Sequence, residues 1–432
     1  MVEESPGHSV VRPLACLIIH SPLNPLIVVH SRKRERNYIV MTEKDEKRSQ
    51  KVEVWEPAVV TQAIRNHYDG LGPIKRASLI REGFNHNYKI EMQNGTKYVF
   101  RVYLSGKYYV RDQVHGDDLQ FELDLLTFLR SKGLSVAEPI VTKHGSTLGS
   151  TTYADTDKRF FALFHFAKGQ ALENRWKRLT QQQYFALGKL MAQVHVAADE
   201  FETQRHRYHL NDETYLLDET LNVLDSLFQQ HGMEDTTFFR PFAEELRAKI
   251  LAQLPKSTPT YGIIHADLHL GNIFYDDETN QFTLIDFDHC AYGWRAYDMA
   301  PCAHLGRTTC DWILEGYNAV HPLEAAEIES FATLNKLRNV WDMGDVALYQ
   351  PLWGQPVDKQ FLENASRQLH CMMGDSSFYC GPPLWLLATD VAGNLAVLTL
   401  VVWCFHEMIK NRACFRWLWL QGAAVFKKNH KS

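Results

Sequence analysis

The chain has 432 residues, of which 45% are hydrophobic, so it can fill a sizeable core and has the length of roughly two or three domains. Its formal net charge of −5 argues against a nucleic-acid-binding protein, which would show a basic face. The cysteines show no zinc-ligand spacing and lie mostly in apolar surroundings, which predicts reduced core thiols in a cytosolic protein. They are Cys16, Cys290, Cys302, Cys310, Cys371, Cys380, Cys404 and Cys414.

The pattern of the N-terminal residues 1–50 is less clear than that of the residues that follow. The apolar stretch 11–30 contains prolines and follows Glu3 and Glu4 instead of a basic region, which does not fit a signal peptide. Two interpretations remain open for this segment: it is a disordered extension, or Met41 is the true start of the protein.

Strand-like segments follow in the N-terminal half. Residues 81–90 place a turn that contains Gly83 and Asn85 between two such segments, although hairpin turns of this composition are common. Residues 97–103 are rich in aromatic and β-branched side chains, which predicts a strand that carries Arg101.

A helix is predicted for residues 119–130, with Glu122 on its apolar face. A carboxylate within an apolar stripe needs a partner, and Arg101 on the preceding strand is the natural candidate. The alternative is that Glu122 is an ordinary solvated helix acid. The apolar residues on the same helical face are Leu119, Leu125, Leu126 and Leu129.

Two further elements precede the most informative part of the chain. Residues 160–169 predict an apolar strand that contains Phe166 and ends at Gly169. Residues 183–198 predict a helix, and His195 lies on its apolar stripe. A histidine in this position is more often a hydrogen-bonded core residue than a catalytic one.

Residues 261–298 hold two acidic centres, Asp267 and Asp286, with Asn272 between them. Each acid follows a short apolar run that predicts a strand, so each strand would deliver its acid to a loop. This is the layout of a kinase-type catalytic loop followed by a metal-binding aspartate. Mg²⁺ prefers oxygen ligands and usually takes only one or two carboxylates, which Asp286 and Asn272 would satisfy.

The motifs HADLHLGN at 265–272 and IDFDHCAYGWRAYD at 285–298 resemble the Brenner-type signature of the aminoglycoside phosphotransferase and choline kinase superfamily. That family usually has glycine where this chain has Ala266. The resemblance implies an α+β, two-lobed protein-kinase-like fold, with a small antiparallel-sheet N-lobe and a mainly helical C-lobe.

The resemblance covers about residues 57–350 and divides the chain into regions. It implies a nucleotide-binding lobe at 51–168 and a catalytic and substrate lobe at 169–354. Residues 355–432 are expected to form a helical C-terminal segment. The apolar run 391–405 within that segment is shorter than the ~18–20 residues that a membrane span requires, so a buried helix is expected.

Roles for the loop residues follow from the resemblance. It implies that Asp267 is the catalytic base and that Asn272 and Asp286 bind Mg²⁺. Asp298 is then a structural acid, and His265 supports the loop.

The resemblance also assigns the nucleotide side of the site. Arg101 would contact the phosphates of ATP and pair with Glu122, as the strand lysine and helix glutamate of kinases do. The turn that contains Asn85 would cover the nucleotide. Phe166 would lie in the hinge between the lobes, where backbone groups read the adenine edge.

The acceptor is the open question. We expect a cytoplasmic enzyme that uses ATP and Mg²⁺ to phosphorylate a small hydroxyl-bearing molecule, with no nucleic-acid or membrane partner. Residues 331–349 resemble a helix of the bacterial stress-response protein kinases, with Arg338 and Trp341 near the cleft, so a protein hydroxyl is an alternative acceptor. Aromatic residues that would instead form a cage for an alkylammonium group, or belong to the core, are Trp294, Tyr297, Trp341 and Trp353.

Two alternatives from other classes remain open. The spacing of His265, Asp267 and His269, with further acids and His289 nearby, would suit a metal-dependent hydrolase. It leaves Arg101 unexplained. A pseudokinase that binds nucleotide without turnover is the other alternative, although residues suited to the base and metal-ligand roles are all present.

Overall fold

The computed structural model describes residues 53–83, 85–104, 114–153, 157–174, 178–210, 218–233, 238–353 and 357–374. All of them belong to one structural unit, Thr42–Ser432. Residues 1–50, with the alternative start Met41, and the apolar run 391–405 lie outside the described residues.

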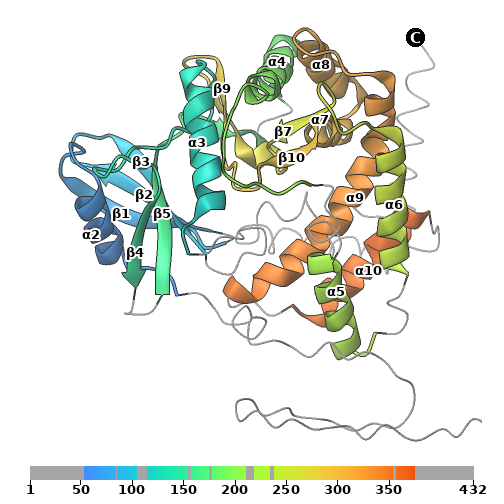
Figure 1. Ribbon diagram of the computed structural model, residues 1–432, viewed down its shortest axis with the longest axis horizontal. Coiled ribbons are helices and arrows are strands. Elements are labelled where there is room, and N and C mark those ends of the chain that lie inside the picture. The colour runs from blue at the N-terminus through green and yellow to red at the C-terminus, as the bar shows by residue number, and fades with distance from the viewer. Residues whose placement is uncertain are drawn as a thin grey trace, which may run out of the picture. The chain divides into compact units, whose positions relative to one another are not determined.

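The N-terminal part combines an antiparallel sheet with two helices (Figure 1). Its five strands follow the order β1-β2-β3-β5-β4 in the described chain. The elements are α2 (Pro57–His67), β1 (Ile74–Arg81), β2 (Asn85–Met92), β3 (Lys97–Tyr103), α3 (Asp117–Ser131), β4 (Gly149–Tyr153), β5 (Asp157–His165), β6 (Gln170–Ala171) and the 3₁₀ turn η1 (Leu172–Asn174).

The two faces of this sheet bury different residues. Side chains alternate along a strand, so Phe100 and Val102 of β3 face α2 and pack in a core with Trp55. Arg101 and Tyr103 therefore face the opposite side, where α3 lies (Figure 1). The sheet therefore directs the guanidinium of Arg101 toward α3, the helix that carries its predicted partner Glu122.

The strand predicted for residues 160–169 is only partly confirmed. β5 ends at His165, which pairs with Tyr98 near the start of β3. Beyond that point one hydrogen bond follows, from the backbone N–H of Phe166 to the carbonyl of Lys97, the first residue of β3, and the pairing ends before Gly169. The strand at 97–103 and the helices at 119–130, 183–198 and 331–349 are confirmed, the last as the greater part of a longer helix.

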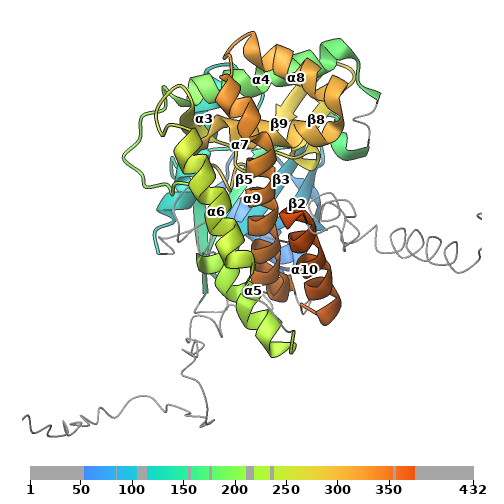
Figure 2. The same ribbon diagram turned by 90° about the vertical axis from the view of Figure 1, so that its right-hand side faces the viewer.

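The C-terminal part is mainly helical, with short strands at its centre. Its elements are α4 (Gln181–Ala198), α5 (Glu219–Gln230), α6 (Phe239–Gln253), β7 (Tyr261–Ile264), η4 (Leu270–Asn272), β8 (Ile273–Asp276), β9 (Gln281–Leu284), β10 (Ala291–Trp294), α7 (Arg295–Met299), η5 (Ala300–Leu305), α8 (Arg307–Asn318), α9 (Ala325–Tyr349), η6 (Gln350–Trp353) and α10 (Lys359–Met373). β7 pairs with β10, and β8 lies between β6 and β9. Helices α5, α6 and α10 pack against the long helix α9 (Figure 2).

Helices α4 and α8 approach each other closely through two glycines. A Cβ atom on Gly188 would lie 1.9 Å from the carbonyl oxygen of Ile313, and one on Gly316 would lie 1.9 Å from that of Phe185. The backbones are therefore in direct contact, and neither position has room for a side chain.

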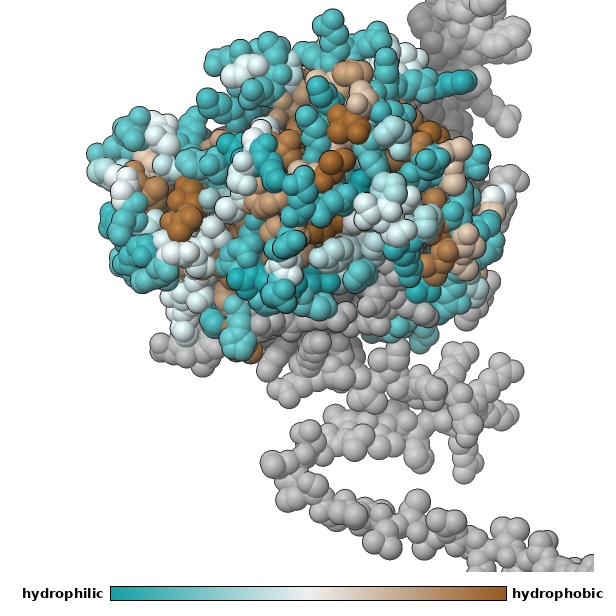
Figure 3. All heavy atoms as spheres, turned by 45° about the horizontal axis from the view of Figure 1, so that its top comes forward, coloured by the Kyte–Doolittle hydropathy of each residue, from teal (hydrophilic) through white to brown (hydrophobic). Residues whose placement is uncertain are grey.

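The surface of the described residues is largely hydrophilic on the face in Figure 3, where hydrophobic groups are separated by polar ones. Among the described residues, no helix is long and apolar enough to cross a membrane.

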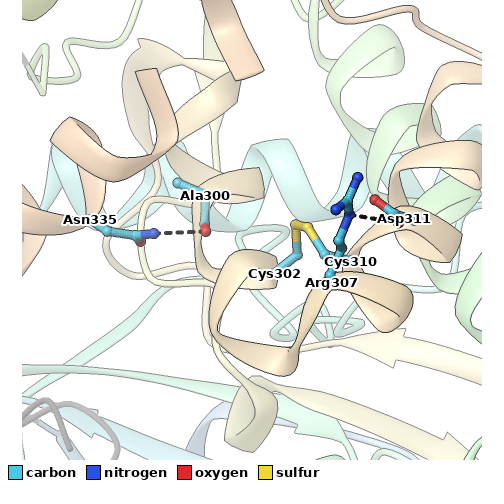
Figure 4. Close-up of a disulfide and its surroundings, with 6 residues drawn as sticks. All are labelled: Ala300, Cys302, Arg307, Cys310, Asp311 and Asn335. Carbon is cyan, nitrogen blue, oxygen red and sulfur yellow. Dashed lines mark hydrogen bonds and ion pairs between the residues drawn. A yellow bond between two sulfur atoms is a disulfide. The ribbon is translucent and has the colours of Figure 1, made fainter. Parts of the chain in front are cut away.

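The expectation of reduced cysteines is wrong for part of the chain. Cys302 of η5 and Cys310 of α8 form a disulfide (Figure 4), and Cys371 is also disulfide-bonded. Gly306, with a φ of 90°, reverses the chain between η5 and α8 and brings the Cα atoms of Cys302 and Cys310 within 4.9 Å, a distance that a disulfide spans. The buried Cys290 is free. A cytosolic location thus loses the support of reduced thiols and stays a prediction.

Candidate active site

The loop between β7 and β8 is held by Asp298 of α7. Its carboxylate accepts hydrogen bonds from the backbone N–H groups of His265, at 2.7 Å, and Ala266, at 2.9 Å. The Nε2 atom of His195 lies 3.0 Å from the same carboxylate. Asp298 therefore fixes the backbone just before Asp267, as predicted for a structural acid.

Two residues of the site adopt the left-handed backbone conformation that favours glycine. Ala266 has a φ of 65° and Asp286 a φ of 66°. For an L-residue this conformation costs roughly 1–2 kcal/mol, and such strain gathers at functional sites. The φ of Ala266 explains why glycine would suit this position.

Asp267 is held from both sides. Arg338 of α9 donates from Nη2 to Oδ1 at 3.0 Å, and Asn272 donates from Nδ2 to Oδ2 at 3.3 Å. Burial would raise the pKa of Asp267, but the charges of His269 and Arg338 outweigh it and lower this pKa below the ordinary 3.8. The carboxylate is therefore ionised at neutral pH, and its side chain remains 28% exposed.

Asn272 and Asp286 lie next to each other across the strand ends. The backbone N–H of Ile285, the residue before Asp286, donates to the carbonyl of Asn272 at 2.9 Å. The Nδ2 atom of Asn272 is directed to Asp267, at 3.0 Å from its carbonyl oxygen, which leaves the amide oxygen as an acceptor. One carboxylate and one amide oxygen form a donor set that suits Mg²⁺ with water and phosphate ligands.

Arg101 joins the sheet to this site. Its Nη1 lies 3.2 Å from Glu122 Oε1, and its Nη2 lies 2.8 Å from Asp286 Oδ1. Burial alone would lower the pKa of Arg101, but these two carboxylates raise it, so the guanidinium stays charged. Glu122 is buried, which rules out the solvated alternative. Burial raises its pKa to about 7 although Arg101 opposes the shift.

A double-mutant cycle tests the pairing of Arg101 with Glu122. We expect Arg101→Ala and Glu122→Ala each to lower kcat/KM for Mg·ATP, and the double variant to lose less than the two single losses combined. Residues in contact couple by about 0.5–3 kcal/mol in such cycles, whereas distant residues are additive. Arg101→Lys should be milder than Arg101→Ala, because a cation remains while the planar fork of donors is lost.

The control for this cycle combines Arg101→Ala with Glu278→Ala, a change in the exposed turn between β8 and β9. These two changes should be additive. If the Arg101 and Glu122 changes were additive as well, their contact would have no part in activity.

Asn85 and a residue that the sequence analysis missed, Arg207, complete the connection between sheet and loop. Asn85, predicted to cover the nucleotide, is buried at the start of β2, and its Nδ2 donates to Asp288 Oδ2 at 2.8 Å. The buried Arg207 donates to the carbonyl of Asp118 in α3 at 2.8 Å and to the carbonyls of Asp288 and Cys290. Arg207 lies in a polar stretch without periodicity, so nothing in the sequence indicated this role.

Other predicted residues are not brought to the loop by a described contact. Phe166 follows β5, and its backbone N–H donates to the carbonyl of Lys97 at 3.3 Å, so its hinge role stays a prediction. Trp294, Tyr297 and Trp341 are buried in the main hydrophobic core, as the core alternative to a cage expected. The side chain of Trp353 lies outside the described residues.

The metal-hydrolase alternative is not supported. In the parts of the chain that the structure describes, no three His, Cys, Asp or Glu side chains gather in a way that could hold a metal ion. Both ring nitrogens of His265 are engaged, Nε2 with the carbonyl of Ile285 at 2.8 Å and Nδ1 with the N–H of Asp267 at 3.3 Å.

Comparison with known families decides the class of this site. Residues 76–326 match the model of the phosphotransferase enzyme family (APH). The chain belongs to this phosphotransferase family. The matched region includes Arg101, Glu122 and the whole stretch from His265 to Asp298.

Relatives with about 30% sequence identity to this chain include homoserine kinases. The homoserine kinase of Agrobacterium fabrum is 31% identical over 239 residues, which cover 52% of this chain and 67% of that protein. The homoserine kinase of Brucella anthropi is 30% identical over 288 residues, covering 63% of this chain and 78% of that protein. An uncharacterized protein of Synechocystis is 31% identical over 291 residues, which cover 66% of this chain and 76% of that protein.

Solved structures of small-molecule kinases share the fold. Amicoumacin kinase hAmiN, in complex with AMP-PNP and Ca²⁺, matches with a TM-score of 0.59 and 19% identity, covering 78% of this chain and 97% of that one. A microcompartment-associated aminopropanol kinase matches with a TM-score of 0.56 and 21% identity, covering 74% and 94%. These likenesses confirm the predicted α+β, two-lobed, kinase-like fold.

Proposed function

We propose that this protein transfers the terminal phosphoryl group of ATP to the hydroxyl of a small molecule, with Mg²⁺ as the metal ion. The support is a continuous series of contacts across the site. It runs from Glu122 through Arg101 to Asp286, and from Asn272 through Asp267 to Arg338. The hydrogen bond between Ile285 and Asn272 joins the two halves.

Asp267 is the proposed catalytic base. Its ionised carboxylate accepts a hydrogen bond from the acceptor hydroxyl and takes the proton as the hydroxyl oxygen attacks the terminal phosphorus. The bond from that phosphorus to its bridging oxygen breaks, and ADP leaves. Arg338 and Asn272 hold one oxygen each of the carboxylate, so its orientation is set before the acceptor binds.

Asn272 and Asp286 are the proposed metal ligands, and Arg101 is the proposed phosphate contact. Mg²⁺, when bound, supplies positive charge that neutralises the phosphate oxygens. Arg101 adds a second positive charge near the proposed phosphate position. Its contacts with Glu122 and Asp286 hold its guanidinium beside the proposed metal ligand Asp286. Phe166 is the proposed hinge residue beside the adenine. Asn85 is proposed to act on the nucleotide side through the turn before β2, which its buried hydrogen bond to Asp288 anchors.

The proposed lobes are 51–168 for the nucleotide and 169–354 for catalysis and the acceptor. We favour a small acceptor because the kinases described above take their names from small molecules: homoserine, amicoumacin and aminopropanol. The alternative of a protein acceptor depended on the helix at 331–349 alone and gains no support from them.

A turnover assay tests this proposal. Purified full-length protein is incubated with Mg·ATP and homoserine, 3-aminopropanol or no acceptor, and ADP and phosphomonoester are measured by enzymatic coupling and ³¹P NMR. We expect equal amounts of both products with at least one alcohol, and none after removal of Mg²⁺ with EDTA. Nucleotide binding without consumption, across a wide panel of alcohols, would indicate a pseudokinase instead.

A further inference from the structure

Buried polar atoms without hydrogen bonds gather beside Asp267. Within the described part of the chain, Tyr297 Oη, Arg338 Nη1 and Asp342 Oδ2 are buried and make no hydrogen bond. The Cζ atom of Arg338 lies 5.6 Å from the centre of the Tyr297 ring, and its Nε lies 3.8 Å from Asp342 Oδ2. Buried polar atoms almost always have partners, so such a cluster indicates a ligand that supplies them.

The charges in this cluster do not balance. Arg338 lies between two carboxylates, because its Nη2 binds Asp267 Oδ1 at 3.0 Å while Asp342 lies one helical turn further along α9. Another basic group near Asp267 is His269, whose Nε2 lies 3.8 Å from Asp267 Oδ2, but burial lowers the pKa of His269, so its ring is largely neutral at neutral pH. One guanidinium cannot neutralise both acids, so the cluster attracts a further positive charge. The side chain of Asp342 is 17% exposed, which leaves a ligand access to it.

We propose that Asp342 binds the ammonium group of an amino alcohol whose hydroxyl is oriented by Asp267, an inference that rests on the phosphotransferase function proposed above. Because a single guanidinium contacts both carboxylates, the ammonium and hydroxyl groups must be joined by a short carbon chain. Tyr297 Oη and Arg338 Nη1 then remain to bind a further oxygen of the acceptor.

The electrostatics of Asp342 agree with this role. Burial raises the pKa of Asp342 to about 7, Asp267 raises it as well, and Arg338 opposes them. The empty carboxylate therefore carries a proton part of the time at neutral pH, and a bound ammonium would favour its ionised form.

The test compares acceptors that differ only in the amine. The probes are 3-aminopropanol against 1,3-propanediol, and homoserine against 4-hydroxybutanoate. We expect the wild-type protein to prefer each amine in kcat/KM. Asp342→Asn should lower kcat/KM for the amines by about 10- to 100-fold, mainly through KM, because a hydrogen bond to a charged group is lost.

Control variants separate recognition of the amine from general damage. Asp342→Asn should leave KM for ATP unchanged. It should lower kcat/KM for the amines more than for the amine-free alcohols, because any displacement of Arg338 affects both acceptor classes alike. Asp342→Glu should retain part of the preference. Glu329→Gln, which removes an exposed acid from the same helix, should alter neither acceptor class. Equal losses for amines and amine-free alcohols in Asp342→Asn would overturn the proposal.

Two further outcomes keep the inference distinct from the proposed function. If no alcohol is phosphorylated, the proposed function fails, and calorimetric titration of 3-aminopropanol into the protein with Mg·AMP-PNP decides the amine site. Binding to wild type that is lost in Asp342→Asn supports the site, and equal binding refutes it. If Asp342→Asn does not fold, a wild-type protein without any preference for the amines overturns the proposal.

Discussion

Replacement of Asp267 by alanine is expected to lower kcat by about 10²- to 10⁴-fold, the usual contribution of a positioned general base. Affinity for Mg·ATP should change little, because Asp267 contacts neither Arg101 nor Asp286, and the proposed metal ligand Asn272 keeps its 3.0 Å hydrogen bond to the backbone carbonyl at position 267. Its lowered pKa adds a second expectation: the wild-type rate should show no acidic limb from this carboxylate near neutral pH.

Single-turnover kinetics together with nucleotide titration measure both quantities for the Asp267 variant. Glu278→Gln, in the exposed turn after β8, is the matched control and should behave as wild type. A collapse of nucleotide affinity along with turnover would contradict the assignment of Asp267 to the acceptor.

Asp286→Asn should weaken Mg²⁺ binding and turnover together. The substitution removes the proposed charged metal ligand. The loss should exceed 10- to 100-fold, which is about the cost of removing an outer-shell partner of a metal site. Asparagine adopts the left-handed conformation readily, so the φ of 66° at this position should persist and the fold should survive.

The dependence of turnover on Mg²⁺ concentration is the measurement for Asp286. A higher Mg²⁺ requirement, with an unchanged thermal unfolding midpoint, is the expected result. Asp69→Asn, an exposed acid beyond α2, serves as the control. An unchanged Mg²⁺ requirement in Asp286→Asn would mean that the metal is held elsewhere.

Much of this fold was predictable because local patterns and tertiary contacts agree. The strand that carries Arg101 is confirmed with the same bounds, since its alternating aromatic and β-branched residues match a sheet with two buried faces. The pairing of Arg101 with Glu122 also followed from local reasoning, because a carboxylate on an apolar helical stripe must find a partner.

Other contacts were beyond prediction because they join residues far apart in the chain. The hydrogen bond between Asn85 and Asp288 spans 203 positions, and no local pattern specifies it. Arg338 was placed near the cleft only by resemblance, and its bond to Asp267 depends on how α9 packs. Asp342 lies one turn after Arg338 on a helix that carries several other acids, so the sequence alone did not distinguish it, and its significance needed the position of Asp267.

The glycine contact between α4 and α8 limits which changes the enzyme can tolerate away from its chemistry. His195 of α4 meets Tyr317 of α8 at 2.8 Å, and His195 in turn contacts Asp298, which holds the loop of Asp267. Even one methyl group on Gly188 or Gly316 would force the helices apart and shift this support. Natural variation at these two glycines should therefore be as restricted as at the loop itself, although neither touches a reacting atom.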